Sequence, residues 1–315
     1  MKKLTVVYKN NITSVVLLGF PNLKHIKVLN FIVLLAIYCV TICGNFLVMA
    51  LSLLSKNLQS PMYFFISQLS LFDIMLSTVI LPNLLYIVLY DGCTMSLTGC
   101  ITQFSFFTTT ETCECLLLTV MSYDRYLAIY KPFHYNSIIN RTFCIKTVLI
   151  IWLLGIKITL INPISMSTLE YCGPNIIDHF YCDFEPILAL SCSDTSWINL
   201  QTILLAFFFV AVPFLIIILS YIYIAATVLK IPSATGRQKA FSTCSSHLSV
   251  VSIFYGTIIV VYLFAKRGQM HVMSKLLSLF YTVITPLLNP MIYTFRNKEF
   301  KKVLEKLLSK SSTFW

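Results

Sequence analysis

The residues of this chain whose types and spacing best suit chemistry are Asp124 and Arg125, followed by Tyr126. They stand just after a long apolar segment, 98–122, where an apolar helix is expected to meet water. An acid and a base at such a boundary form an ion pair that can break to admit a partner. The same pair can also be a simple interfacial anchor, so its interpretation depends on the rest of the chain.

Two further acids, Asp73 and Glu114, lie within apolar segments, where ionisable groups are costly and therefore mark candidate functional sites. If the two carboxylates face one buried cavity, they cannot both ionise unaided. They would then share a proton or bind a small cation such as sodium. The alternative is that each is neutral and hydrogen-bonded to a neighbouring hydroxyl.

Glu111 lies one helical turn from Glu114, in the hydroxyl-rich stretch Thr108–Thr112. It could accept a hydrogen bond from a ligand, pair with a cationic ligand, or neutralise a basic residue inside the protein. We favour the internal ion pair, and the candidate partners of Glu111 in it are Lys157 and Lys275.

The elements that must position these residues are helices in a membrane. Hydrophobic residues make up 57% of the chain and charged residues 11%, against about 25% charged in soluble domains. Runs of about 20 apolar residues predict an all-α bundle of seven transmembrane helices, roughly at 28–54, 62–90, 98–122, 144–164, 198–229, 240–264 and 272–294. We expect an N-terminal tail (1–27), a bundle (28–294) and a cytoplasmic helix and tail (295–315).

The distribution of Lys and Arg predicts which loops face the cytoplasm, because positive residues resist translocation. With the N-terminus outside, the outer loops carry only Lys266 and Arg267, and the inner loops and C-terminal tail carry many more. The lysines of the N-terminal tail oppose this orientation, which we nevertheless favour. A glycosylation sequon at Asn11 is then outside, and a second one at Asn140 is inside and should stay unmodified.

The last segment of the chain predicts an amphipathic helix on the inner leaflet. Apolar residues recur at i, i+3, i+4, i+7 and i+8, opposite Lys and Glu, namely Phe300, Val303, Leu304, Leu307 and Leu308. The membrane lipid is therefore one expected partner.

Several classes of protein are disfavoured. The net charge of +11 is dispersed along inner membrane boundaries and does not indicate nucleic-acid binding. No phosphate-binding loop, His-Glu-x-x-His motif or nucleophile triad predicts an enzyme or a cofactor. A transporter or channel would use the intramembrane charges as a path, but the odd span number and the lack of an inverted repeat argue against it. His179, near Cys182, could bind a metal, although we interpret it as structural.

Five cysteines fall on the predicted outer side, where oxidation is possible, namely Cys93, Cys100, Cys172, Cys182 and Cys192. Two bridges would leave one thiol free, and the spacing alone does not fix the pairing. The long loop at about 165–198 contains three of them and is acidic, so cross-links would tie it down.

With these pieces in order, the chain resembles the vertebrate odorant receptors among the rhodopsin-like G-protein-coupled receptors. The resemblance runs through nearly the whole chain, in motifs that keep the family's order and spacing: Gly44-Asn45, Leu58–Tyr63, Leu69–Asp73, Met121–Tyr126, Ser220-Tyr221, Lys239–His247 and Pro286–Tyr293.

The resemblance implies a Cys100–Cys182 bridge from the third span to the outer loop and a Cys172–Cys192 bridge within that loop. It implies switch roles for Asp124, Arg125, Tyr126, Tyr221 and Tyr293, with Arg125 released as span six moves and a G protein enters. It also places Asp73, Glu114 and Asn289 in the family's cation-site region.

The resemblance further implies a pocket for small, mostly apolar volatile ligands in the outer half of the bundle. Our candidates for its lining are Phe107, Thr108, Glu111, Thr112, Phe209, Tyr255, Ile259, Tyr262 and Thr282. The implied partners are an odorant and the stimulatory olfactory G protein, which raises cyclic AMP at the plasma membrane. A rhodopsin-like receptor for a non-odorant metabolite or peptide is the alternative.

Three positions depart from related patterns. Phe107 stands where amine receptors place an Asp, and Val283 stands where opsins bind retinal, so light sensing is disfavoured. Tyr130 replaces the more usual Cys of the family.

Overall fold

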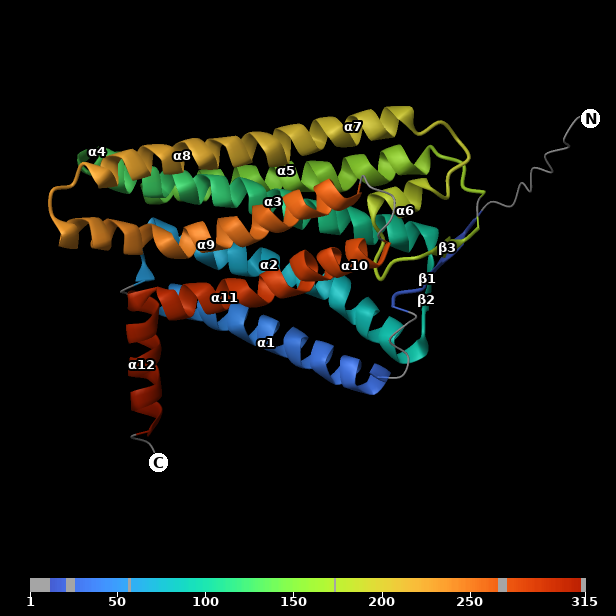
Figure 1. The fold of residues 1–315 in the computed structure, drawn as a ribbon, viewed down its shortest axis with the longest axis horizontal. Coiled ribbons are helices and arrows are strands. Elements are labelled where there is room, and N and C mark those ends of the chain that lie inside the picture. The colour runs from blue at the N-terminus through green and yellow to red at the C-terminus, as the bar shows by residue number, and fades with distance from the viewer. Residues whose placement is uncertain (1–11, 21–25, 56–57, 173, 266–270, 313–315) are drawn as a thin grey trace, which may run out of the picture. The chain divides into compact units, whose positions relative to one another are not determined.

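A computed structural model describes residues 12–20, 26–55, 58–172, 174–265 and 271–312 of the chain (Figure 1). Long apolar runs form helices because a backbone surrounded by lipid must satisfy its hydrogen bonds within one segment. The principal helices are α1 (Lys27–Leu54), α2 (Pro61–Tyr90), α3 (Leu97–Tyr130), α5 (Arg141–Ser167), α7 (Ser196–Ala206), α8 (Val212–Leu229), α9 (Ala234–Ala265), α10 (His271–Leu279) and α11 (Thr285–Arg296).

The predicted spans agree with these helices, with α7 and α8 forming one span and α10 and α11 another. By length and hydropathy alone, the described residues contain five helices able to cross a membrane, or six when the two halves of α9 count as one. The remaining helix, α3, is less apolar because Thr and Glu residues interrupt its N-terminal half.

Two predicted boundaries were wrong. Helix α3 continues to Tyr130 instead of ending at 122, because Asp124 is fully buried and the helix ends only before Pro132. Helix α9 starts at Ala234 rather than at 240, because the polar residues there continue the helix. The short helix α4 (Pro132–Ile138) then connects α3 to α5.

The chain divides into two compact units, which share the long helices. The first comprises residues 1–35, 79–109 and 156–205, and the second comprises residues 36–78, 110–155 and 206–315.

A three-stranded sheet organises the first unit, a feature that the all-α prediction did not include. Strand β1 (Ser14–Leu17) is central; it pairs antiparallel with β2 (Cys93–Ser96) and parallel with β3 (Ile176–Ile177). Val15 and Leu17 are fully buried, so alternate side chains of β1 fix its register.

A glycine ends this strand segment for a steric reason. Gly19 has φ of +62°, and a Cβ there would lie 2.3 Å from Cγ2 of Ile87. A side chain at this position would have to displace Ile87 of α2, so the approach of the N-terminal segment to that helix requires glycine.

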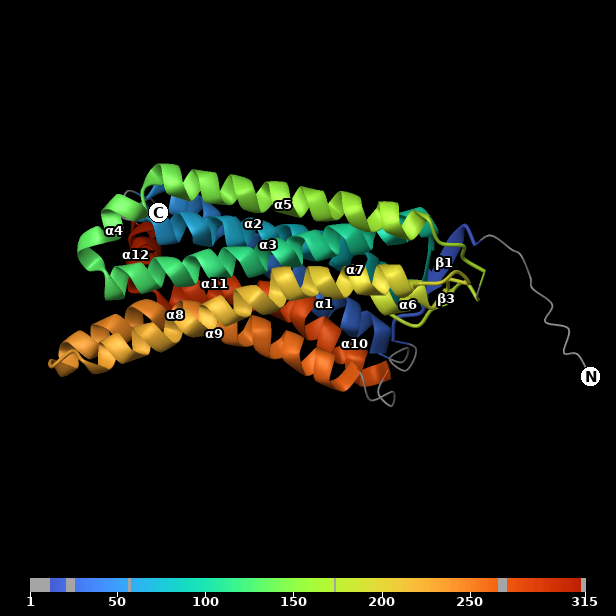
Figure 2. The ribbon, with the colours of Figure 1, turned by 90° about the horizontal axis from the view of Figure 1, so that it is seen from above.

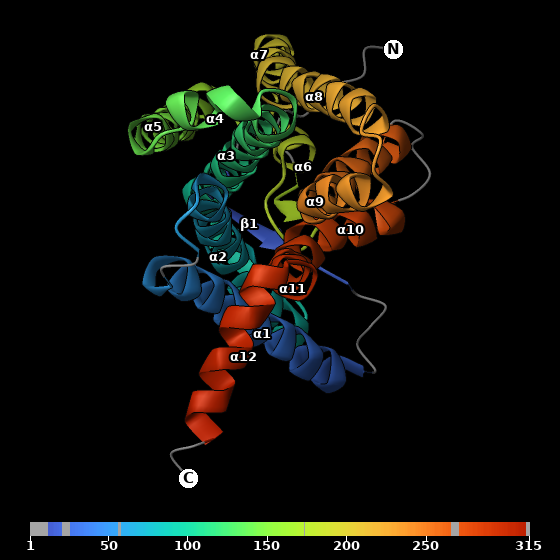
Figure 3. The same ribbon diagram turned by 90° about the vertical axis from the view of Figure 1, so that its left-hand side faces the viewer.

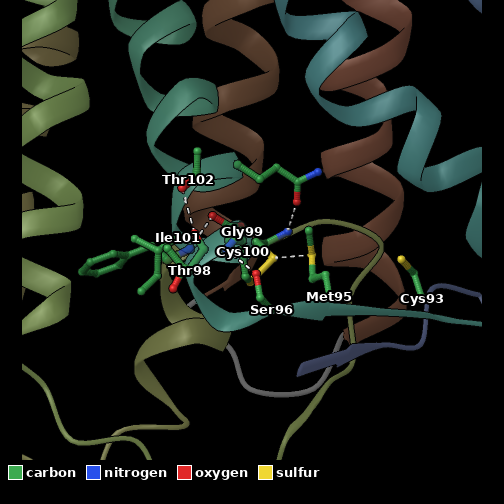
Figure 4. The surroundings of a disulfide bond; sticks show 12 residues. Cys93, Met95, Ser96, Thr98, Gly99, Cys100, Ile101 and Thr102 are labelled. Carbon is green, nitrogen blue, oxygen red and sulfur yellow. Dashed lines mark hydrogen bonds between the residues drawn. A yellow bond between two sulfur atoms is a disulfide. The ribbon is translucent and has the colours of Figure 1, made fainter. Parts of the chain in front are cut away.

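Two disulfides tie the long loop of this unit, joining Cys100 to Cys182 and Cys172 to Cys192. Figure 4 shows the first bridge at the start of α3, next to Met95 of β2. The backbone N–H of Cys182 also donates to Oε1 of Gln103 at 3.0 Å. The loop is thereby held by covalent and hydrogen bonds at the same helix end.

The loop acid Asp183 caps the short helix α6 (Phe184–Leu188). Its carboxylate accepts from the N–H of Phe184 at 2.8 Å and from the hydroxyl of Tyr181 at 3.1 Å. These bonds favour the ionised form, but burial is the larger effect and raises the pKa of Asp183 above its ordinary value.

The second unit contains one large apolar core, drawn from α1, α2, α3, α5, α8, α9, α11 and α12. Asn45 of α1 donates its side-chain N–H to the carbonyls of Thr41 and Pro286. Helices α9 and α11 lie beside each other (Figure 3), and α8 runs along α9 (Figure 2). These packed pairs position the polar groups described below.

The C-terminal helix α12 (Lys298–Ser312) follows α11 directly (Figure 1). Phe300 is fully buried and its ring meets Tyr63 edge-on at 5.3 Å, while the Tyr63 hydroxyl donates to Oδ1 of Asn297 at 3.1 Å. Val303 is also buried. The first turns of this predicted amphipathic helix therefore pack on protein.

Candidate functional site

Asp124 and Arg125 form an ion pair that is almost fully buried. Nε of Arg125 donates to Oδ2 of Asp124 at 2.8 Å, and a terminal guanidinium nitrogen contacts the same oxygen. The second oxygen, Oδ1, accepts from the Tyr135 hydroxyl of α4 at 2.7 Å. Both oxygens of Asp124 are thus satisfied, and Arg125 is held along its own helix end.

A second polar contact joins α8 to α9. The Tyr221 hydroxyl and Nδ1 of His247 are 2.7 Å apart, and both side chains are largely buried. Tyr293 of α11 is also buried, and its hydroxyl has no partner among the described residues. Two of the predicted switch residues, Tyr221 and Tyr293, are therefore buried on different helices, and their switch roles stay a prediction.

Tyr126 lies in a group of tyrosine rings. It stacks on Tyr130 at 5.1 Å and meets Tyr223 of α8 edge-on at 6.0 Å. The Tyr that replaces the family's usual Cys thus extends this aromatic contact.

The buried acids of the second unit differ in their partners. Asp73 accepts from the amide of Asn289 through both carboxylate oxygens, at 2.9 and 3.1 Å. Glu114 lies within electrostatic reach of Asp73. It is 1% exposed, and its Oε1 has no partner among the described residues. The Oδ1 atom of Asn289 is likewise without one there.

Two of the predicted ligand-binding residues are engaged in protein contacts in the first unit. Phe107 is buried with its ring 5.3 Å from that of Tyr181, and the Thr108 hydroxyl accepts from the amide of Asn162 on α5 at 2.9 Å. Thr109 and Thr159 make a neighbouring contact between the same helices. Two of the four threonines in the hydroxyl-rich stretch Thr108–Thr112, namely Thr108 and Thr109, therefore face α5.

The other predicted lining residues lie in the second unit. Glu111 is half-buried, Thr112 and Thr282 are buried, and Tyr255 is buried with its ring stacked on Phe214 at 4.6 Å. The Tyr255 hydroxyl lies near Cys115 and within electrostatic reach of Glu111. Phe209 is half-buried and Ile259 is exposed, and the side chain of Tyr262 lies outside the described residues.

The two candidate lysines have opposite environments. Lys275 of α10 is 4% exposed, and Lys157 of α5 is exposed on the helix surface. Of the two partners predicted for Glu111, only Lys275 is buried as an internal ion pair would require.

The sequence interpretation missed several features of the site. Two π-helical turns, η3 (Phe207–Ala211) and η4 (Phe280–Ile284), precede prolines and contain Phe209 and Thr282. Such turns occur often at functional sites, and the prolines were a usable signal because each removes a backbone donor. Phe133 of α4, 98% exposed, was also missed, as was the His247 contact.

These features define a class, that of multi-pass helical membrane proteins. The family model described as olfactory receptor matches residues 34–311, and the chain belongs to the olfactory receptor family, whose members are receptors and not enzymes. Among similar human proteins, Olfactory receptor 10A7 (Homo sapiens) is 44% identical over 96% of this chain and 98% of its own length. Olfactory receptor 11A1 (Homo sapiens) is 42% identical over 94% of each chain.

Proposed function

We propose that this chain is an odorant receptor that binds small, mainly apolar volatile ligands and activates the stimulatory olfactory G protein to raise cyclic AMP. Membership in the olfactory receptor family carries this proposal. The Glu111–Tyr255 region supports the ligand class, because a few polar groups among buried aromatic and aliphatic side chains suit ligands held by burial and one or two hydrogen bonds.

We expect cells that express this chain with an olfactory G protein to raise cyclic AMP in response to some members of a volatile panel that includes amines and acids. Glu111→Gln should shift the potency of these ligands, by about tenfold for one lost charge-assisted hydrogen bond. The exposed Glu299 supplies a matched control, and Glu299→Gln should leave the potencies unchanged. If cyclic AMP did not rise although the receptor was at the cell surface, a non-volatile ligand or another G protein would be favoured.

The proposed G-protein contact rests on the α3–α4 corner. Phe133 is an almost fully exposed aromatic ring next to the Asp124–Arg125 helix end. Exposed aromatic anchors of this kind often carry the binding energy of an interface, and a released Arg125 would lie close by.

The proposed orientation places the N-terminus outside the cell. The N-terminal strand β1 shares a unit with both disulfides, which persist only where conditions are oxidising. Asn11 lies outside the described residues; Asn140 caps α5, accepting the N–H of Phe143 at 2.9 Å. We expect Asn11→Gln to abolish a glycosidase-sensitive gel shift, and Asn140→Gln to leave it unchanged. A glycan at Asn140 instead of Asn11 would mean that the membrane topology is the reverse of the one proposed.

The proposed role of Asp73, Glu114 and Asn289 is to hold a shared proton or a small cation such as sodium. The unpartnered oxygens of Glu114 and Asn289 support it, because buried polar atoms are rarely left unsatisfied. For a cation, replacing sodium in the medium should change ligand potency in the native receptor but not in Glu114→Gln. For a shared proton, a change of pH instead of sodium should change ligand potency in the native receptor but not in Glu114→Gln. Insensitivity to both would contradict the assignment.

A further inference from the structure

Lys157 lies within a membrane span, on the exposed outer face of its helix. It is exposed on α5, and its neighbours along the same outer surface are apolar: Ile156, Leu160 and Ile164 are 51%, 58% and 65% exposed. The opposite face of α5 carries Asn162, which is buried and bonded to α3. Charged residues within a span normally face the bundle interior, so Lys157 requires an explanation.

The position of Lys157 along α5 places it inside the hydrocarbon. The helix has 27 residues and is about 40 Å long, so about 5 Å extends beyond each side of a 30 Å hydrocarbon layer. Lys157 precedes Ser167 by ten residues, about 15 Å, which leaves its Cα about 10 Å below the nearer boundary. A lysine side chain spans only about 6 Å.

The direction of the helix makes escape to that boundary harder. In an α-helix the Cα–Cβ bond is tilted toward the N-terminus, and the N-terminus of α5 is Arg141, at the more distant membrane face. The Lys157 side chain therefore starts in the direction of the bilayer centre. Lysines near helix ends can extend their ammonium groups to the headgroups, but the Lys157 side chain is too short and starts in the opposite direction.

We propose that this face of α5 docks a transmembrane helix of another membrane protein, and that the partner helix carries an Asp or Glu at the depth of Lys157. The exposed Ile156, Leu160 and Ile164 would pack on that helix around the ion pair. Charge complementarity identifies the partner's chemistry, because a carboxylate is what an ammonium in hydrocarbon requires.

A second copy of this chain does not supply that carboxylate. In the described part of the membrane helices, Asp73, Glu114 and Asp124 are buried and Glu111 is half-buried. None of these acids is exposed on an outer surface. The partner is therefore a different protein.

The test uses the full-length receptor and single-span probe helices in vesicles of phosphatidylcholine. One polyleucine probe carries Glu about seven residues from the boundary nearest to Ser167, which matches a depth of 10 Å; matched probes carry Leu or Lys there. We expect energy transfer to report about tenfold tighter association with the Glu probe than with the Leu probe, in the range of interhelical polar contacts in membranes.

Variants of the receptor make this result specific. Lys157→Leu should abolish the preference for the Glu probe, and Lys157→Glu should transfer it to the Lys probe. Lys146→Leu, at an exposed lysine near the start of the same helix, should retain it. Equal binding of the Glu and Leu probes, or a preference that survives Lys157→Leu, would overturn the proposal. So would loss of the preference in vesicles with equal parts phosphatidylserine, because the anionic lipid headgroup would then be the occupant.

Discussion

Replacing Arg125 with Ala should abolish ligand-evoked cyclic AMP while leaving surface expression roughly intact. The guanidinium is bound by Asp124 in this structure, and the proposed switch needs it as the group that is released toward the G protein. Surface expression should survive because Tyr135 still donates to the remaining Asp124 carboxylate. The measurement is cyclic AMP together with surface labelling of the same cells.

A second variant guards against simple misfolding. Where nothing compensates the remaining charge, removing one partner of a buried ion pair costs about 3–5 kcal/mol, and in Arg125→Ala the Tyr135 bond is the only compensation for Asp124 that the structure shows among its described residues. Asp124→Asn combined with Arg125→Ala removes that charge and should still be silent. Arg141→Ala, at an exposed arginine that starts α5, should signal normally. Signalling by the double variant would disprove the assigned role of Arg125.

Cys100→Ser should cause the largest loss of stability and of receptor at the cell surface. Its bridge closes 82 residues, whereas the Cys172–Cys192 bridge closes 20. Loop-closure entropy gives about 4.5 kcal/mol for the longer loop and about 3.3 kcal/mol for the shorter one. Surface labelling and thermal inactivation should therefore rank Cys100→Ser below Cys172→Ser.

The free thiol of the same region provides the control. Cys93 lies on β2, two residues from Met95, and forms no disulfide in the structure (Figure 4). Cys93→Ser should resemble the native receptor in both measurements. A loss as large as that of Cys100→Ser would mean that the cysteines pair differently.

The spans could be predicted closely because hydrophobic length is a strong local signal, and the two largest errors have physical causes. Helix α3 was ended too early because Asp124 and Arg125 look like a water boundary in sequence, whereas they satisfy each other and stay buried. Strand β1 was missed because four residues carry little periodicity and their partners come from two distant loops.

The candidate site shows a similar limit. A sequence identifies the polar residues of a helix but not the neighbour that each one faces. Thr108 stays a predicted lining residue of the ligand pocket, but its bond with Asn162 could not be read from the sequence. The Tyr221–His247 contact depends on the rotation of α8 against α9, which residue types alone do not determine.

The central strand of the small sheet also sets the order in which the receptor can be completed during synthesis. Strand β1 is made first, but its parallel partner Ile176 pairs with Val16, 160 residues earlier in the chain. At about 5–20 residues per second, the ribosome takes on the order of ten seconds or more to reach that partner. For all of that time β1 lacks the pairing that it makes with β3 in the folded receptor, so the sheet is completed only after the long loop has been made.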